Sequence, residues 1–516
     1  MTISKLINNL LIVLTMLAFC AQLVIDFSTV NIATSTLILS SALLTLFYLR
    51  WTRALETHPL SSFAIFGFSF TTVIGAIWIQ SATWTPVIKN LHQPFFTFSW
   101  LALFQAVSIL AHMVYRNNRK SSRPNQPGFL TSLFDSMSIY AIQPVSVIWL
   151  MGVIGLFGVL LAKIFPVANG LSFLAWMPFL IPINYLLIGK SYCNLKVHLI
   201  FIVFQILIIG LLGIFFNSRG LLFSGIYTLI LIFAFRAMRS QALVSSVMLF
   251  RSLSFLILAV AISQPVSNIV TAMAIEKTNS GRVSPIRIIE NTFNNYNNPK
   301  KLESYRNTIK NQSEFSRYEE RYIDNPVLAR LVTTKFHDNA LYFADRISDN
   351  ASEEIMRISV RFLYTAFPQP FLDILKIDIQ KDSMRHTMGD LLSNYSVGTP
   401  LGGYRTGSMF GQGLLLFGNY FIIIYFAICI IMFAAIDIFS KATTEGVIVF
   451  SAIGILNLGS YFGSGITADS LHVLFIGAIR GVLQPVVLYF IVVSIAKFIT
   501  RFFSFNVNSK QFLGLK

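Results

Sequence analysis

Most of this chain is a succession of long apolar runs separated by short polar stretches. A membrane-spanning helix needs about 20 mostly apolar residues, and runs of about that length recur from one end to the other. They predict twelve spans, at residues 7–25, 32–49, 61–80, 95–115, 139–162, 169–188, 197–216, 221–236, 250–272, 413–437, 446–463 and 474–498. The pattern therefore predicts an all-α polytopic integral membrane protein with one long polar segment between the spans.

Composition agrees with this class. The 516 residues are 55% hydrophobic with a mean hydropathy of +0.67, which is more apolar surface than a soluble fold can bury. The predicted spans divide the chain into an N-terminal membrane region at 1–272, an extracytoplasmic loop at 273–412 and a C-terminal membrane region at 413–516. The first region is expected to hold about nine helices and the last about three.

Lysine and arginine are distributed unequally between the short loops on the two sides. Leaving aside 273–412 and Arg480, seventeen basic residues fall on one side and three on the other, namely Lys89, Lys163 and Arg219. Basic residues are retained on the cytoplasmic side of membrane proteins. Both termini are therefore predicted to be cytoplasmic, with 273–412 outside the membrane on the opposite face.

The net charge of +17 lies on these short loops. Residues 273–412 hold 18 of the 39 basic residues and 16 of the 22 acidic ones, so the large loop is almost neutral. A nucleic-acid-binding protein would carry its positive charge on a soluble domain, and we exclude nucleic acid as a partner. None of the three cysteines lies in the loop, so it is expected to hold neither a disulfide framework nor a zinc site.

The large loop shows two kinds of pattern. Residues 277–322 are polar, with the run "NTFNNYNNPKK", and are predicted to be irregular. Residues 325–366 mix apolar and charged positions at helical spacing, which predicts amphipathic helices on the outer surface of the membrane. The glycine-rich segment 398–413 then leads into the tenth span.

Arginines dominate the polar groups expected on the outer face. Arg219 stands in "FFNSRGLLFSG" (215–225), a turn with almost no loop around it. Arg385 and Arg405 lie in the large loop, and Arg480 joins them if the last span begins near Val482. Forked guanidinium donors suit phosphate oxyanions away from bulk water, so the set predicts a pyrophosphate-binding site without a metal. Ordinary salt bridges to Asp and Glu are the alternative for each of these arginines.

At this point the chain resembles the bacterial O-antigen or oligosaccharide repeat-unit polymerases of the Wzy type. The resemblance covers the layout of spans, the cytoplasmic termini and the dominant loop in the second half. Two local matches carry it further, "NSRG" at 217–220 and "TPLGGYRTGSMFGQGLLLFGNYF" at 399–421, which contains the aromatic–glycine pair Phe417–Gly418.

The resemblance implies a glycosyltransferase of the bacterial inner membrane that joins glycans carried on undecaprenyl pyrophosphate. It implies no cofactor and no metal, and as partners the lipid-linked glycan, membrane lipid, a chain-length regulator and a repeat-unit flippase. Arg219 and Arg405 are expected to bind the pyrophosphate, with Arg480 or Arg385 assisting. His337, Asp338 and Asp390 are the candidates for a catalytic base.

Two alternatives stay open from the sequence. The related O-antigen ligases share the architecture and often use a histidine of the large loop, which here offers only His337 and His386. A glycolipid flippase or transporter without covalent chemistry is the other, and it needs a polar central cavity instead of a base.

Overall fold

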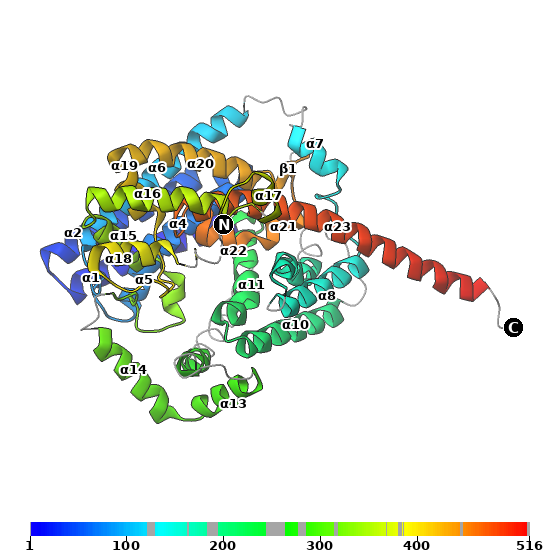
Figure 1. Ribbon diagram of the computed structural model, residues 1–516. Helices are drawn as coiled ribbons and strands as arrows, with labels where there is room; N and C mark the ends of the chain where they lie inside the picture. The colour runs from blue at the N-terminus through cyan, green and yellow to red at the C-terminus, as the bar shows by residue number, and fades with distance from the viewer. Residues whose placement is uncertain are drawn as a thin grey trace. The chain divides into compact units, whose positions relative to one another are not determined.

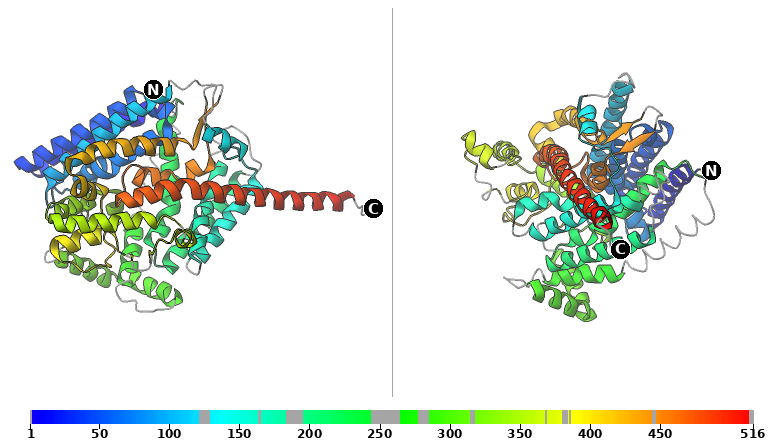
Figure 2. Two further views of the ribbon diagram at one scale, coloured as in Figure 1. Left: turned by 45° about the horizontal axis from the view of Figure 1, so that its top comes forward. Right: turned by 90° about the vertical axis from the view of Figure 1, so that its right-hand side faces the viewer.

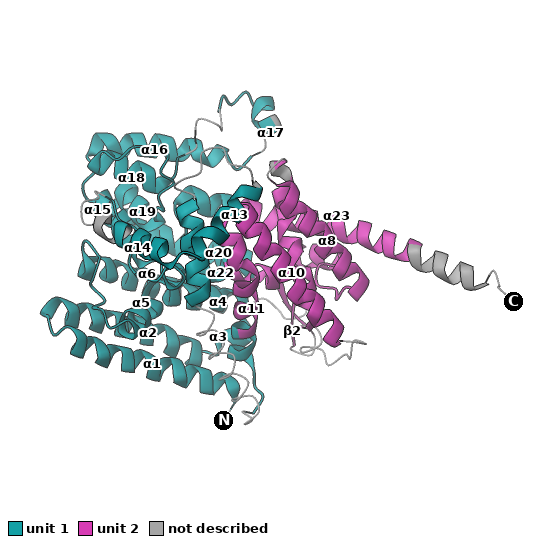
Figure 3. Ribbon diagram, turned by 90° about the horizontal axis from the view of Figure 1, so that it is seen from below, with its two compact units in different colours: residues 1–121, 234–436, 460–478 teal, residues 122–233, 437–459, 479–516 magenta. Residues whose placement is uncertain are grey.

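The computed structural model describes residues 2–120, 129–162, 165–182, 195–243, 264–276, 285–313, 318–367, 369–379, 384, 386–443 and 447–512. The chain forms two compact units (Figure 3). Unit 1 comprises residues 1–121, 234–436 and 460–478, and unit 2 comprises 122–233, 437–459 and 479–516. The large loop 273–412 thus belongs to the same compact unit as the first helices of the chain, whereas the predicted three-part division follows the chain order.

Unit 1 is built from helices of very different lengths (Figure 1). Its elements from the first part of the chain are α1 (Ile3–Ile25), α2 (Thr29–Trp51), α3 (Ala54–Thr57), α4 (Pro59–Ser69), the π-helical turn η1 (Phe70–Ile74), α5 (Gly75–Ala82) and α6 (Pro94–Lys120). Later elements are α13 (Pro285–Tyr296), α14 (Pro299–Ser313), η3 (Leu328–Leu331), α15 (Thr334–Ala344), α16 (Asp349–Tyr364), α17 (Gln369–Ile374), α18 (Met388–Val397), α19 (Met409–Phe417) and η5 (Gly418–Tyr420).

Unit 2 contains α7 (Phe129–Ser136), α8 (Val145–Leu161), the 3₁₀-helical η2 (Pro166–Phe179), α10 (Leu195–Phe215), β1 (Ser440–Ala442), β2 (Ile448–Phe450) and α21 (Ala452–Leu456). Helices α11 (Arg219–Arg239), α20 (Phe421–Asp437), α22 (Leu458–Ser464) and α23 (Leu471–Phe512) each contain a boundary between the units. The unbroken run of α23 is visible in both views of Figure 2.

Eight helices of the described residues are long and apolar enough to cross a membrane. This confirms the prediction of an all-α membrane protein. The predicted runs 139–162 and 169–188 appear as the shorter apolar helices Val145–Leu161 and Ala168–Pro182, and most of the run 250–272 lies outside the described residues.

The span predicted at 446–463 is wrong as a single helix. Its first residues form β2, which pairs antiparallel with β1. The β-branched residues Val447, Ile448 and Val449 favour an extended backbone. Ser451 then caps α21 by accepting a hydrogen bond from the Gly454 N–H, and α21 ends after one turn at Asn457.

The large loop is more ordered than its composition predicts. The segment 277–322, predicted to be irregular, contains α13 and α14. The helical spacing of 325–366 is confirmed by α15 and α16, and α16 is amphipathic, with Ile355, Ser359 and Phe362 buried on one face. The surface position predicted for this region is wrong for α15, because nine of its eleven residues are buried.

Helices α4, η1 and α5 form the centre of unit 1 as one continuous span, Pro59–Ala82. In its most apolar stretch 89% of the residues are buried, against 50% or less in each of the other seven long apolar helices. Buried polar groups join this span to its neighbours α2 and α6. His112 bonds the Tyr48 hydroxyl through Nδ1 at 2.6 Å and the Ser61 hydroxyl through Nε2 at 2.8 Å. Paired in this way, the three polar side chains avoid the cost of unsatisfied burial.

Glycine allows close backbone approach inside unit 1. A Cβ atom on Gly67 of α4 would lie 2.2 Å from the carbonyl oxygen of Phe462 in α22, whereas a Cβ on Gly477 of α23 would meet nothing within 4 Å. Only a residue without a side chain fits the first position.

We expect Gly67→Ala to lower the melting temperature of the detergent-solubilised protein, because overpacking of this kind costs about 1–3 kcal/mol. Gly477→Ala is the matched control and should leave stability unchanged or raise it by up to about 1 kcal/mol, the helix propensity gained over glycine. Equal melting temperatures for the two variants would contradict the close approach.

Candidate functional site

The large loop enters unit 1 through α15, which packs against the π-helical turn in the middle of the Pro59–Ala82 span. The Thr333 N–H donates to the Thr71 carbonyl at 2.8 Å, and the Thr334 hydroxyl donates to the Thr72 carbonyl at 2.7 Å. Thr71 is twelve residues into the span, about 18 Å from its start along the helix axis. Helix α15 also packs on α6, α18 and α19, so it holds the remaining parts of the loop in place.

Asp338, a predicted base, fastens α15 to the start of α6. Its carboxylate accepts hydrogen bonds from the backbone N–H groups of His92 and Gln93, at 2.8 and 3.0 Å, and from the Thr97 hydroxyl at 3.0 Å. The Lys335 ammonium is 3.0 Å away, and the two charged side chains are 3% and 0% exposed. These four donors occupy the acceptor positions of the carboxylate, which makes Asp338 a structural anchor in this arrangement.

His337, the second predicted base, is also buried. Its Nδ1 lies 2.8 Å from the Ser408 hydroxyl, and Ser408 caps α19 by accepting from the Phe410 N–H. Burial lowers the pKa of His337 to about 4, so the ring is neutral at physiological pH. The histidine joins α15 to the start of α19.

Asp390, the third predicted base, fixes the glycine-rich segment before α19. It forms a capping box with Thr387 at the start of α18. Its carboxylate also accepts from the backbone N–H groups of Tyr404 and Arg405, at 3.0 and 3.3 Å. Although burial raises the pKa of this carboxyl, the hydrogen bonds from Thr387, Arg405 and Tyr404 and the Arg405 charge outweigh that effect and hold it below its usual value.

Arg405, predicted to bind pyrophosphate, is paired with this same carboxylate. Its Nη1 lies 3.2 Å from Asp390 Oδ1 and donates to the Pro400 carbonyl at 2.8 Å. Its guanidinium also lies 5.0 Å from the ring centre of Tyr318. Arg405 is therefore not a free cation, and the salt-bridge alternative is correct for it. Its Nε and Nη2 groups make no hydrogen bond within the described residues.

Tyr404 presents its ring to solvent beside this arginine. The residue is 66% exposed, and its backbone is in the left-handed region with φ of 52°. A non-glycine residue seldom adopts this conformation, and here the hydrogen bond from the Tyr404 N–H to Asp390 retains it.

Three segments of unit 1 meet around Gly407. The Thr406 N–H donates to Glu320 at 2.8 Å, and the Met409 N–H donates to the Ala468 carbonyl at 2.9 Å. A Cβ on Gly407 would lie 2.5 Å from the Asp469 carbonyl. We call this meeting point of 318–320, 404–407 and 468–469 the Gly407 junction.

Asp469 is an acidic residue at this junction that was not among the candidate bases chosen from the sequence. The residue as a whole is exposed. The pKa of its carboxyl is nevertheless raised, chiefly because the surrounding protein displaces water from it and to a smaller extent because of the negative charge of Glu320. Its carboxylate has no hydrogen-bond donor or ion-pair partner in the described part of the chain. A raised pKa is the direction that a carboxylate needs to act as a general base near neutral pH.

Arg219 begins α11 in unit 2. Asn217, with φ of 49°, turns the chain, and Ser218 caps the helix by accepting from the Leu221 N–H at 3.4 Å. Arg219 is half-buried and makes no ion pair with any residue in the ranges described. A Cβ on Gly220 would meet nothing within 4 Å, so the first turn of the helix is unobstructed there.

The remaining two arginines predicted to bind pyrophosphate are Arg480 and Arg385. Arg480 was expected to join the other arginines on the outer face only if the last span began near Val482. Helix α23 begins earlier, at Leu471, and Arg480 is its tenth residue. Arg385 lies outside the described residues.

His386, which with His337 is one of the two loop histidines considered for a ligase, flanks the ring of Phe362 together with His472. The ring centres lie 5.4 and 4.4 Å from that of Phe362. Burial lowers the pKa of His386 despite the opposing charge of Asp390. Both histidines pack against an aromatic core residue of α16.

Within the described ranges no group of three or more His, Cys, Asp or Glu side chains is placed to hold a metal ion. Comparison with protein-family models, with curated proteins and with solved structures gives no match to this chain.

We expect Asp338→Asn to destabilise the protein by about 3–5 kcal/mol, because it leaves the Lys335 ammonium buried without its counter-charge. Asp345→Asn, an exposed position at the end of the same helix, is the control and should change stability by less than about 0.5 kcal/mol. Thermal unfolding in detergent measures both. A small effect for Asp338→Asn would show that the pair is not buried.

We expect protein stability to fall between pH 7 and pH 4.5 in part through His337. A histidine whose pKa is about 4 when folded and about 6.5 when unfolded makes the unfolded state bind more protons in this window. Acidification therefore removes about 2–3 kcal/mol of stability. His337→Asn should lose less stability over the same interval, and a pH dependence identical to that of the wild type would contradict the assignment.

Proposed function

We propose that this protein is a membrane glycosyltransferase that polymerises undecaprenyl-pyrophosphate-linked oligosaccharide repeat units into O-antigen, capsule or exopolysaccharide chains at the outer leaflet of the bacterial inner membrane. The observation that carries the proposal is the Gly407 junction. There a fixed arginine with unused donors, an exposed tyrosine and a carboxyl with a raised pKa lie on segments that meet in one place. The long apolar helices and the sequence resemblance support the same class.

The proposed reaction needs no metal. A sugar hydroxyl of the acceptor glycan attacks the anomeric carbon of the donor glycan, and a new glycosidic C–O bond forms. The bond from that carbon to the pyrophosphate oxygen breaks, and undecaprenyl pyrophosphate leaves with the electron pair. The hydroxyl proton passes to a carboxylate. Pyrophosphate is already a good leaving group, so the protein has to neutralise its charge and align the two substrates.

We assign the roles as follows. Arg219, which belongs to unit 2, is proposed separately as a pyrophosphate ligand, because it is a cation without a carboxylate partner among the described residues at an unobstructed helix start. Arg405 offers its Nε and Nη2 donors, and Tyr404 offers an exposed ring against which a sugar can stack. Asp469 replaces His337, Asp338 and Asp390 as the proposed base, because those three side chains are held by structural hydrogen bonds.

We expect purified protein supplied with lipid-linked repeat unit alone to produce a ladder of products on a gel. Asp469→Asn and Arg219→Ala should each reduce the rate of ladder formation by about 100-fold or more, which is the usual contribution of a general base or of a donor that stabilises developing charge. Arg219→Lys should retain part of the activity, because it keeps the charge and loses the forked geometry.

Lys89→Ala and Asp345→Asn are the matched controls, since each removes an exposed charge of the same sign, and both should form normal ladders. Product formed only after addition of a lipid A–core acceptor would indicate a ligase. Absence of any covalent product, with lipid-linked glycan still moving across the membrane, would indicate a transporter.

A further inference from the structure

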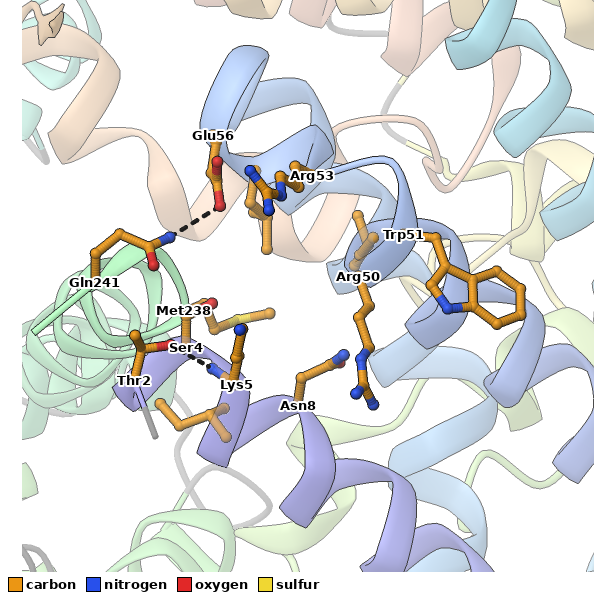
Figure 4. Close-up of a pocket in the computed structure, with 13 residues that line it drawn as sticks. Thr2, Ser4, Lys5, Asn8, Arg50, Trp51, Arg53, Glu56, Met238 and Gln241 are labelled. Carbon is orange, nitrogen blue, oxygen red and sulfur yellow. Dashed lines mark hydrogen bonds between the residues drawn. The ribbon is translucent and has the colours of Figure 1, made fainter. Parts of the chain in front are cut away.

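A second polar site lies in unit 1, near the start of α1 and the end of α2. Its residues belong to segments predicted to be cytoplasmic. It is a pocket of about 600 Å³ between the start of α1, the end of α2 and the short helix α3 (Figure 4). This volume is within the range of small-molecule binding sites. The proposed glycosyl transfer does not use this pocket.

The lining of the pocket is cationic. Lys5, Arg50 and Arg53 line it together with one carboxylate, Glu56. In Figure 4 Lys5 and Arg50 lie on one side of the pocket, and Arg53 and Glu56 on the other. The Glu56 carboxylate accepts a hydrogen bond from the Gln241 side chain at 2.8 Å. None of the three cations forms an ion pair in the part of the chain that the structure describes, so the pocket has an unbalanced positive charge.

Two local features indicate that these groups are positioned for a ligand. The side-chain nitrogen of Asn8, which lines the pocket, is buried and has no hydrogen-bond partner among the described residues. Buried donors are nearly always paired, and a bound anion would pair this one. Arg53 is in the left-handed backbone region with φ of 48°, a strained conformation for a residue with a side chain.

The surroundings of the pocket are apolar on one side. Trp51 lines it and is 75% exposed, and farther along α1 the side chains of Leu10, Val13 and Leu17 are exposed. Tryptophan is enriched where a membrane meets water, and basic pockets between membrane helices bind anionic lipid head groups. The forked donors of a guanidinium group match the geometry of phosphate oxygens, as they do that of carboxylates.

We propose that this pocket binds the phosphate group of an anionic amphiphile, with Lys5, Arg50, Arg53 and the Asn8 amide as donors. The ligand class is a phosphate ester whose apolar part lies along α1 beside Trp51. Phospholipid head groups have this chemistry, and soluble phosphates share the charged part of it.

Native mass spectrometry of the full-length protein in detergent tests the proposal. The probes are phosphatidylglycerol, zwitterionic phosphatidylcholine and inorganic pyrophosphate. We expect phosphatidylglycerol to bind more tightly than phosphatidylcholine, and Arg50→Ala/Arg53→Ala to weaken phosphatidylglycerol binding at least about tenfold. Lys196→Ala/Lys497→Ala removes the same number of cations outside the pocket, and it should bind like the wild type.

Glu56→Gln provides a test that does not depend on deleting donors. It removes the single carboxylate of the pocket and keeps an oxygen that can accept from Gln241, so phosphatidylglycerol binding should strengthen about two- to fivefold. Selective pyrophosphate binding with the same pattern of variant effects, and no preference between the two lipids, would support a phosphate site filled from solution.

Three outcomes would overturn the proposal. The wild type shows no preference between the two lipids and no pyrophosphate binding, or the pocket and control double variants weaken binding equally, or Glu56→Gln leaves the affinity unchanged. All of them are separate from the fate of the proposed polymerase, because the assay involves no glycan.

Discussion

Unit 1 depends on two hydrogen bonds in the middle of an apolar helix. Thr71 and Thr72 lie in a π-helical turn, and their carbonyl groups accept hydrogen bonds from the Thr333 N–H and the Thr334 hydroxyl. A buried carbonyl group left without a partner would cost about 1–3 kcal/mol. The span and the loop helix α15 therefore satisfy polar groups of each other at this contact.

Most other contacts of the large loop follow from the position of α15. Asp338 accepts from the N–H groups of His92 and Gln93, just before α6, and His337 reaches the hydroxyl that caps α19. Helix α18 packs on α15 and carries Asp390, which fixes the backbone at Tyr404 and Arg405. The loop is thus an integral part of the core of unit 1, and its glycine-rich segment is rigidly presented.

The polar and charged residues named above fall into two groups. One group holds the large loop together through hydrogen bonds, and the other is available to a ligand. Asp338, Asp390 and His337 are buried and hydrogen-bonded, which explains why substituting them would alter folding before chemistry. Asp469, Tyr404 and Arg219 are at least partly accessible, and none of their side chains is held by an ion pair within the described residues. Availability to solvent, more than residue type, distinguishes the two groups.

The sequence alone determined the class of the protein and most of its long helices, because runs of apolar residues have few alternatives to a membrane span. It also placed Arg219 at a helix start, since the turn is short and local. It could not show that 446–463 forms a strand and short helices, because β-branched apolar residues suit both states. The partners of Asp338, Asp390 and Arg405, and the meeting of Asp469 with residues 404–407, were decided only by tertiary structure. These contacts join positions far apart in the chain, and no local pattern of residues records which distant backbone group a buried charge will reach.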